Sequence, residues 1–513
     1  MRLLAKSHLH LMVVAGIVLA LAGCKVGPDY HRPAAPKATR YAPEALPDTT
    51  VSAPVQGGEA QRLVTSMGIP DQWWALFRSQ PLNALIDDAL KHNADIEAAH
   101  AALRVAQEMV HAQRSTYLPT VTAGVNPTRQ DTPKDLASPL TSGKSLYSLI
   151  TAQVSISYLP DVWGGNRRQV ESLTATANAQ RFQLEAAYLS LTSNLVNAAI
   201  GEASLRAQID TTQRIIDLQT QVLDTLKRQY ALGDVPETTV AAQVAALEQS
   251  RAALPPLQKQ LAQQRDLLAA LSGRTPDHAL DATFTLDRLQ LPTDLPVSLP
   301  AQLVEQRPDV RTAAEQLHAA SADVGVAVAN RLPNVQIDAN FGRTSVKTRT
   351  LFAGGAGFWA LRTNVTRPLF DGGALKHKQR AAEAAYQQAA AQYRGAVIAA
   401  AQEVADTLHA IQADAETLVA VERAERAAAR SLAIARRQLA WGDLSASAVL
   451  TTELAWQQTA LALVQARAAR LTDTVALFQA LGGGWWNRRT VTPSNDGKGV
   501  RVTKRLAQVP DGS

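Results

Sequence analysis

Cys24 is the single cysteine of this 513-residue chain, and the residues before it indicate what its thiol does. Arg2 and Lys6 precede an apolar run at about 11–22, which has the charge order and length of a secretory signal sequence and is too short to span a bilayer comfortably. Small residues stand directly before the cysteine, as a narrow peptidase cleft requires. Because the thiol is nucleophilic, it can accept a diacylglyceryl group. The sequence therefore predicts removal of residues 1–23 and a covalent lipid on Cys24, with no other cofactor.

The residues around the cleavage point also indicate which membrane receives the protein. Leu21-Ala22-Gly23-Cys24 resembles a bacterial lipobox. In lipoproteins with this motif, an Asp after the cysteine favours retention in the inner membrane, whereas this chain has Lys25 and is expected in the outer membrane. An incidental cysteine beside an ordinary signal peptide is the alternative. With Cys24 acylated, no thiol is left for disulfide or thiolate chemistry.

The other residues that could do chemistry form no recognisable catalytic or metal site. His92, His100 and His111 share one helical stretch but lack the four-residue spacing of two metal ligands on one helix face. We find no Ser/His/Asp set, phosphate-binding glycine motif or paired carboxylates in a pocket context. The net charge of +6 is spread over acids and bases interleaved along helices, which indicates solvated faces. We therefore expect neither an enzyme nor a nucleic-acid partner.

The elements that carry these residues occur twice, because the chain is an internal duplication. Leu118-Pro119 recurs as Leu332-Pro333, and Gly233-Asp234 recurs as Gly442-Asp443. The offsets stay within about 208 to 214 residues. Each half is expected to contain a first helical stretch, two strands, a very long helix and a final helix. These expected ranges are 82–117, 166–232 and 237–271 for the helices of the first half, and 301–331, 374–441 and 445–481 for those of the second.

The very long stretches set the scale of the fold. Neither contains Pro, and at about 1.5 Å per residue each would form a helix on the order of 100 Å long. Apolar residues of the first stretch alternate in spacing between four and three, as in a coiled-coil seam, with two polar interruptions. The seam consists of Leu205, Ile209, Thr212, Ile216, Gln219, Leu223 and Leu226.

The strand-like segments have one apolar and one polar face. Period-two alternation is clear at 150–158, 334–341 and 359–366 and weaker at 121–125. Their length suits tilted transmembrane strands, and aromatic residues gather at their ends. A half-buried soluble hairpin is the alternative. Four strands cannot close a barrel in lipid, so several chains would have to share one barrel. Two chains would give eight strands, and side chains would fill the interior of so small a barrel. At least three chains are therefore expected.

This set of features resembles the outer-membrane efflux protein family (TolC-like), in its NodT-type lipoprotein branch. The resemblance covers nearly the whole chain from Cys24 to about Leu481. It is carried by ordered motifs at the expected mature N-terminus, before the first strands and at the start of the second half. These are Cys24-Lys25-Val26-Gly27-Pro28-Asp29-Tyr30, Arg32-Pro33, Trp73-Trp74, Phe77, Leu82, Leu85, Ala89-Leu90, Asn93, Asp95, Ala98, Leu295-Pro296, Arg307-Pro308-Asp309-Val310, Ala314-Glu315, Ala327, Ala329 and Pro333.

The resemblance implies a mainly α fold with a small transmembrane β part. It implies a homotrimer with a long periplasmic α-helical barrel and a twelve-stranded β-barrel, to which each chain gives four strands. The function implied is an outer-membrane channel subunit of a tripartite efflux pump, a passive exit duct for drugs or other toxic small molecules. Its partners would be a periplasmic adaptor and an inner-membrane pump, often of the resistance–nodulation–division class. The alternatives are a periplasmic adaptor lipoprotein and a coiled-coil structural lipoprotein.

The two Gly-Asp pairs are the candidate docking and gating residues. By resemblance, Gly233, Asp234, Gly442 and Asp443 would form the periplasmic tip, where the adaptor docks and the pore narrows. Glycine suits a left-handed helix end and aspartate can cap the following helix, which would explain most of their presence. Threefold symmetry would also place the carboxylates in rings near the aperture.

The expected domain organisation follows the duplication. The ranges are a signal peptide (1–23), a lipidated extended segment (24–80), a first repeat (81–275), a connector (276–300), a second repeat (301–484) and a polar, disordered tail (485–513).

Overall fold

The structure is a computed structural model that describes residues 25–36, 38, 40–44, 47–65, 67–133, 135, 145–278, 281–488, 490–492 and 501–503. Cys24 and the signal sequence lie outside the described residues. The chain divides into two compact units, and both halves of the duplication contribute to each. Unit 1 consists of Met1–Pro33, Ala102–Gln180 and Ala313–Tyr393, and unit 2 of Ala34–Ala101, Arg181–Thr312 and Arg394–Ser513.

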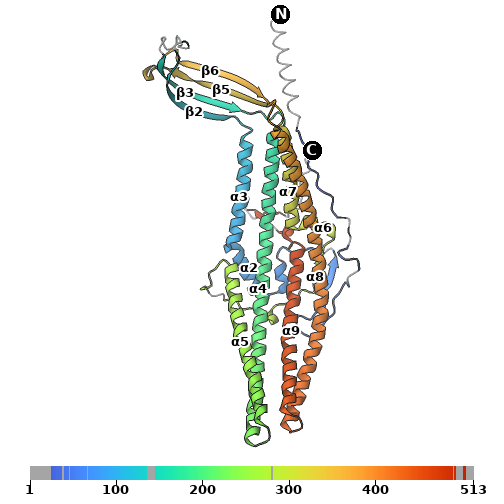
Figure 1. Cartoon of the computed structure of the whole chain (residues 1–513). Coiled ribbons are helices and arrows are strands. Elements are labelled where there is room, and N and C mark those ends of the chain that lie inside the picture. Colours follow the sequence, from blue (N-terminus) through green and yellow to red (C-terminus); the bar gives the residue numbers. More distant parts are fainter. Residues whose placement is uncertain are drawn as a thin grey trace. The chain divides into compact units, whose positions relative to one another are not determined.

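The two halves of the sequence fold into the same succession of elements (Figure 1). The first half contains α2 (Gln80–His92), α3 (Ala94–Ser115), β2 (Thr120–Asp131), β3 (Leu146–Tyr158), α4 (Gly165–Ala231) and α5 (Glu237–Leu271). The second contains α6 (Pro300–Gln306), α7 (Pro308–Ala329), β5 (Asn334–Ser345), β6 (Gly357–Thr366), α8 (Ala374–Ala440) and α9 (Ala446–Ala480). The very long helices are confirmed, since α4 and α8 each have 67 residues.

Short elements complete the chain. A parallel pair joins β1 (Arg62–Thr65) to β4 (Asp294–Val297). The other elements are η1 (Trp73–Phe77), η4 (Leu286–Arg288), η5 (Thr348–Thr350), η6 (Trp485–Asn487), β7 (Thr490–Thr492) and β8 (Arg501–Thr503). Within the described ranges, no helix combines the length and apolar character needed to cross a membrane.

The first helical stretch of each half was predicted as one helix and is two. Asn93 separates α2 from α3 in an extended conformation, and its Oδ1 accepts the backbone N–H of Asp95 at 2.9 Å, which caps α3. Arg307 separates α6 from α7 and is also extended, because the following Pro308 disfavours helical dihedrals at the residue before it. Each break therefore has a local cause.

The four strands of unit 1 form one antiparallel sheet in the order β2-β3-β5-β6, side by side in Figure 1. The register aligns apolar residues across all four strands, and the alternation predicted from sequence is confirmed. One such row is Val121, Ile156, Ala339 and Leu361, and the next is Ala123, Val154, Phe341 and Trp359. The weakly patterned first strand extends to Asp131 and contains Pro127, which an edge strand tolerates.

The seam predicted on α4 packs inside unit 2. Thr212, Gln219 and Leu226 are each at most 1% exposed. Near the two helix turns, α4, α8 and α9 share an apolar cluster, which we call the turn-proximal cluster. It consists of Val222, Leu226, Leu432, Ala435, Leu439, Ala446 and Val449, with Leu218, Val240, Leu444 and Trp456 packed around it.

The packed part of the chain continues past the boundary that sequence set at residue 485. The Trp485 indole N–H donates to the carbonyl of Gln306 at 2.7 Å, and Asn487 Nδ2 donates to the carbonyl of Ile69 at 2.7 Å. Arg488 pairs with Glu185 at 2.9 Å. These three anchors place residues 485–488 in unit 2, so the expected tail begins later.

Candidate functional site

The turn after α4 and the turn after α8 have the same geometry. Gly233 has φ +85° and Gly442 φ +80°, the left-handed conformation that glycine adopts without strain. In the first turn the backbone N–H of Asp234 donates to the carbonyl of Gln229 at 2.9 Å, and in the second Asp443 donates to Gln438 at 2.9 Å. The predicted helix-ending role of both glycines is therefore confirmed.

The predicted capping role of the two aspartates is wrong. The N-cap of α5 is Pro236, and that of α9 is Ser445, whose hydroxyl accepts the N–H of Ala448 at 3.4 Å. Pro236 directly precedes α5 and forms no side-chain cap bond, whereas Ser445 directly precedes α9 and is better placed than Asp443. Both aspartates are exposed, and neither side chain forms a hydrogen bond with the described residues. Their carboxylates are thus available to external groups.

Large apolar residues stand directly before both glycines, and sequence reasoning missed them. Leu232 is 77% exposed and Trp441 is 73% exposed. A Cβ built on Gly233 or Gly442 meets no described atom within 4 Å. Each turn thus presents an exposed apolar side chain, a bare backbone and a carboxylate. The signal in the sequence was the shared position of Leu232 and Trp441 before the repeated Gly-Asp.

The residues that follow Cys24 are held in unit 1 by a buried arginine, which sequence reasoning also missed. Arg168 is fully buried and donates to the carbonyl of Val26 at 3.1 Å, the carbonyl of Gly27 at 3.2 Å and Asp29 Oδ1 at 2.9 Å. Its guanidinium also pairs with Glu171 at 3.0 Å. The only signal in the sequence was a pair of arginines, Arg167 and Arg168, in the first turn of α4. We call Arg168, Glu171 and His318 the N-terminal clamp.

Ion pairs within the clamp favour the charged forms of Glu171 and His318. Glu171 accepts from His318 at 3.1 Å and pairs with Lys25 at 2.9 Å. The hydrogen bond from His318, above all, lowers the pKa of Glu171 to about 2. The same bond is the main cause that raises the pKa of His318 to about 9, and the ring of Tyr30 stacks on His318 at 4.2 Å. The clamp therefore binds Lys25, Val26, Gly27, Asp29 and Tyr30 by charge, hydrogen bonds and stacking together.

Both halves of this architecture match one protein family. The model of the outer membrane efflux protein family matches residues 85–274 and 299–483, which are the greater part of the chain. The chain belongs to the outer membrane efflux protein family.

Several efflux channels are similar to the whole chain. The toluene efflux pump outer membrane protein TtgC of Pseudomonas putida is 28% identical over 485 residues, covering 94% of this chain and 97% of the relative. The outer membrane protein OprJ of Pseudomonas aeruginosa is 29% identical over 498 residues, with the same coverage of both chains. Among solved structures, the outer-membrane channel OprN has a TM-score of 0.80 at 25% identity over 90% of this chain and 100% of OprN. VceC of Vibrio cholerae has a TM-score of 0.76 at 28% identity over 81% of this chain and 100% of VceC.

These similarities decide the function at the level of the family. The protein is an outer-membrane channel subunit of a tripartite efflux pump, with an adaptor and an inner-membrane pump as the other components. Its fold is that of the TolC-like channels, with an α-helical barrel part and a β-barrel part. The adaptor and structural-lipoprotein alternatives are set aside, because the family and the relatives are channels.

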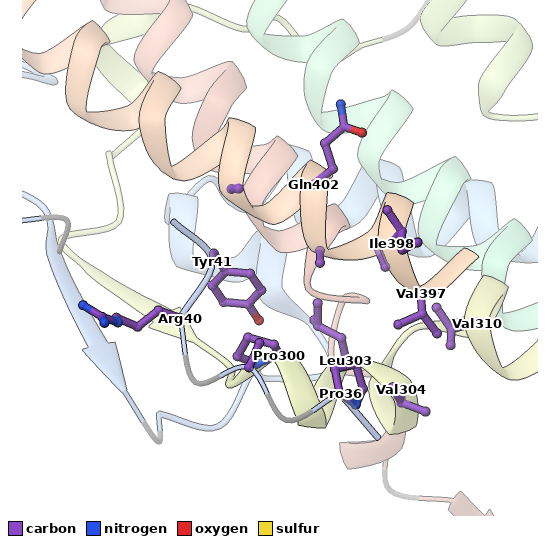
Figure 2. A pocket seen from close by; sticks show the side chains of 14 residues that line it. Pro36, Arg40, Tyr41, Pro300, Leu303, Val304, Val310, Val397, Ile398 and Gln402 are labelled. Carbon is purple, nitrogen blue, oxygen red and sulfur yellow. The ribbon is translucent and has the colours of Figure 1, made fainter. Parts of the chain in front are cut away.

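The cavity shown in Figure 2 lies in unit 2 beneath the extended N-terminal segment. Its volume is about 280 Å³, and Pro36, Tyr41, Pro300 and Leu303 line it opposite Ile398 of α8. The Tyr41 hydroxyl donates to the carbonyl of Ser298 at 2.6 Å, and burial raises the pKa of this phenol. The lining is mostly apolar and brings no group of acids, bases or nucleophiles together.

The three histidines singled out in the sequence have separate surroundings. His92 Nδ1 lies 3.1 Å from Asp88 Oδ1, and His100 Nε2 lies 2.8 Å from the hydroxyl of Tyr188. Over the described ranges, no group of three or more His, Cys, Asp or Glu side chains is placed to hold a metal.

Proposed function

We propose that this subunit is a passive, lipid-anchored exit duct, in which three identical chains complete one twelve-stranded barrel. The observation that carries the proposal is the open sheet. Strands β2 and β6 are its edges, and within the described chain each pairs on one side only. Because unpaired backbone groups are too costly in lipid, neighbouring copies must supply the missing partners.

The apolar face of the sheet supports insertion in a membrane. Phe341, Trp359, Leu361 and Val365 are between 65% and 77% exposed. A contiguous exposed apolar surface of this kind marks contact with lipid or with another protein. The opposite face carries Ser157, Asp338 and Arg362 in register, as a water-filled lumen requires.

The lipid anchor is proposed on Cys24. The clamp fixes Lys25 and Val26, and the backbone N–H of Val26 donates to the carbonyl of Trp163 at 3.2 Å. Trp163 in turn donates its indole N–H to the carbonyl of Pro333, directly before β5. Within unit 1 the residues that directly follow Cys24 in the sequence thus lie beside a strand end and a tryptophan, a residue typical of membrane interfaces.

Docking of the periplasmic adaptor is proposed at the two helix turns. The exposed Leu232 and Trp441 offer apolar contact area, and the bare Gly233 and Gly442 allow close approach of another backbone. The exposed carboxylates of Asp234 and Asp443 would lie near the aperture. The inner-membrane partner is proposed to be a pump of the resistance–nodulation–division class.

Transport through this subunit requires no catalysis, since the pump supplies the energy. The relatives carry names that mention toluene, antibiotics and pyoverdine, which share no single recognition chemistry. A duct that does not bind its cargo selectively is consistent with that range. The proposed cargo is therefore small molecules as a class, and no enzymatic activity is expected.

The decisive experiment combines assembly and conductance. Full-length protein extracted in mild detergent should migrate as a trimer on unheated gels and as a monomer after boiling, and it should form pores in planar bilayers. The matched control is the Cys24→Ala protein, which has no acyl group and is exported with an ordinary signal peptide. A monomeric, water-soluble product without conductance would overturn the shared-barrel proposal.

A further inference from the structure

Glu453 is a buried carboxyl group that the side-chain amide of Gln243 faces without a well-formed hydrogen bond. It lies on α9 and is 2% exposed, and neither of its carboxylate oxygens has a hydrogen-bond partner among the described residues. A buried carboxyl in this condition is costly as an anion and acceptable as a neutral acid. Since most buried polar groups in folded proteins are paired, this one requires an explanation.

Two glutamines accompany Glu453 from the other helical hairpin. Gln219 of α4 is fully buried, and its side-chain Oε1 and Nε2 both lack partners in the described chain. Gln243 of α5 is 2% exposed, lies next to the carboxyl of Glu453 and donates through Nε2 to the backbone carbonyl of Gln219 at 3.4 Å. Gln219 is also one of the two polar interruptions that the sequence showed in the α4 seam. The three side chains together are a polar island.

The island is enclosed by the apolar contact between the two hairpins. Val449 and Trp456 lie one helical turn before and after Glu453 on α9, and both belong to or pack on the turn-proximal cluster. On α4, Val222 of the same cluster follows Gln219 by three residues. Helices α5 and α9 approach within 8 Å between Cα atoms. Glu453 is shielded from water in this packing, and movement of α9 away from α4 and α5 would expose its carboxyl.

The charged groups that face Glu453 are few. From α8, Arg436 favours the carboxylate, whereas Glu425 is engaged with the Trp456 indole N–H at 3.0 Å. Among the described residues of α4 and α5, the side chains assigned to this site are the neutral amides of Gln219 and Gln243. Burial raises the pKa of Glu453 above its ordinary value, because it outweighs both the Gln243 amide and the attraction of Arg436, which favour the carboxylate.

We propose that Glu453, with Gln219 and Gln243, is a proton-binding site that holds the two helical hairpins of one subunit together near their turns. A neutral Glu453 can donate its O–H to an amide oxygen and accept from an amide N–H, whereas the carboxylate can only accept. Loss of the proton leaves an anion inside the apolar contact. Separation of α9 from α4 and α5 then becomes favourable, because water can solvate the carboxylate.

The sign of the pH effect follows from the raised pKa. Below the ordinary pKa of a glutamate, the carboxyl is neutral in both the packed and the separated arrangement, and the contact is at full strength. As pH rises from that value through the raised pKa, the separated arrangement binds fewer protons and gains population. The expected change in the separation equilibrium is about tenfold for each pH unit between the two pKa values.

The test is amide hydrogen exchange of the full trimer in detergent, corrected for the intrinsic pH dependence of exchange and followed over peptides covering 446–456. In the wild-type protein, protection of this segment should fall as pH rises from 4 to 8. Glu453→Gln and Glu453→Met cannot ionise, so protection should not change with pH in either variant, and Glu453→Gln, which can still donate and accept, should stay near the wild-type level at low pH. Arg436→Gln keeps the carboxyl and loses its facing cation, and should move the midpoint to higher pH.

The matched control is Glu416→Gln, which removes one exposed carboxylate from α8 and should titrate as the wild type does. Single-channel conductance of the same proteins gives a second readout, since easier separation should raise the conductance of the wild type with pH. A Glu453→Gln protein that titrates like the wild type would overturn the proposal. So would a wild type with constant protection, or an Arg436→Gln protein with an unchanged midpoint.

Discussion

Asn93 and Arg307 hold equivalent places in the two halves of the chain. Asn93 Nδ2 donates to the carbonyl of Leu271, the last residue of α5, at 3.0 Å. Arg307 Nη1 donates to the carbonyl of Ala480, the last residue of α9, also at 3.0 Å. Each side chain starts from a break between two short helices and satisfies a carbonyl that a helix end leaves unpaired. In both halves a side chain at the helix break thus donates to the last carbonyl of the final helix, through an amide in the first half and a guanidinium in the second.

Removing either closing side chain should destabilise unit 2. Arg307→Ala loses the bond to Ala480 together with partly exposed ion pairs to Asp309 and Glu403, for an expected cost of about 1–3 kcal/mol. Asn93→Ala loses its bond to Leu271 and the cap of α3, for about 1–2 kcal/mol. Thermal denaturation of the purified protein measures both. The exposed pair of Arg62 and Asp294 provides the control, since Arg62→Ala should change stability by less than about 1 kcal/mol.

The sequence predicted those parts of the fold that depend on local pattern. Long helices follow from stretches without proline, and the strands follow from alternation that one apolar face imposes. The break at Asn93 was missed because neither proline nor glycine marks it. Asp443 was assigned as a cap because only its distance from the helix start was visible, whereas Ser445 is the residue that makes the bond. Arg168 was missed because its partners lie about 140 positions away, and such pairing leaves no trace in one sequence.

The N-terminal clamp can be tested through Arg168. Arg168→Gln removes the buried guanidinium that binds Val26, Gly27 and Asp29, and the segment should detach at a cost of about 3 kcal/mol. Trypsin should then cleave after Lys25 much faster, as measured by mass spectrometry of the remaining chain. Arg214→Gln, which removes an exposed pair with Asp210 and a hydrogen bond to Thr211 in unit 2, should leave the cleavage rate unchanged. Equal rates in all three proteins would show that the clamp does not hold the segment.

The clamp should also have a defined pH window. His318 has a pKa raised from 6.5 to about 9, so its contribution is complete below pH 6.5 and is lost as pH rises through 9. Glu171 has a pKa lowered from 4.5 to about 2, so its contribution is complete above pH 4.5 and is lost as pH falls toward 2. The Tm difference between the wild type and His318→Gln should therefore be largest between pH 4.5 and 6.5 and vanish above pH 9. His409→Gln, at an exposed position on α8, should show no such profile.

Valine at both turn glycines tests adaptor docking. Gly233→Val and Gly442→Val place a branched side chain at positive φ, at a cost of about 1–2 kcal/mol each, and fill the open space beside the backbone. Efflux measured by drug susceptibility should be lost while trimers still reach the outer membrane. Gly395→Val is the matched control, because Gly395 lies inside α8 and also has no described neighbour within 4 Å of a built Cβ. Full efflux by the double variant would place docking elsewhere.

Replacing Asp234 and Asp443 together with alanine tests whether the turns also narrow the pore. Because neither carboxylate caps a helix, the change should leave the fold intact and remove only exposed charge. If the carboxylates line the aperture and bind cations there, single-channel conductance or antibiotic leakage should rise, roughly twofold or more at low salt and less at 1 M salt, where charges are screened within about 3 Å. Asp224→Ala removes an exposed carboxylate from α4 and should have no effect. Asparagine at both positions separates charge from volume: an increase with alanine but not with asparagine would assign the constriction to side-chain bulk, and unchanged conductance in both variants with normal trimers would leave the turns as docking elements without a gating role.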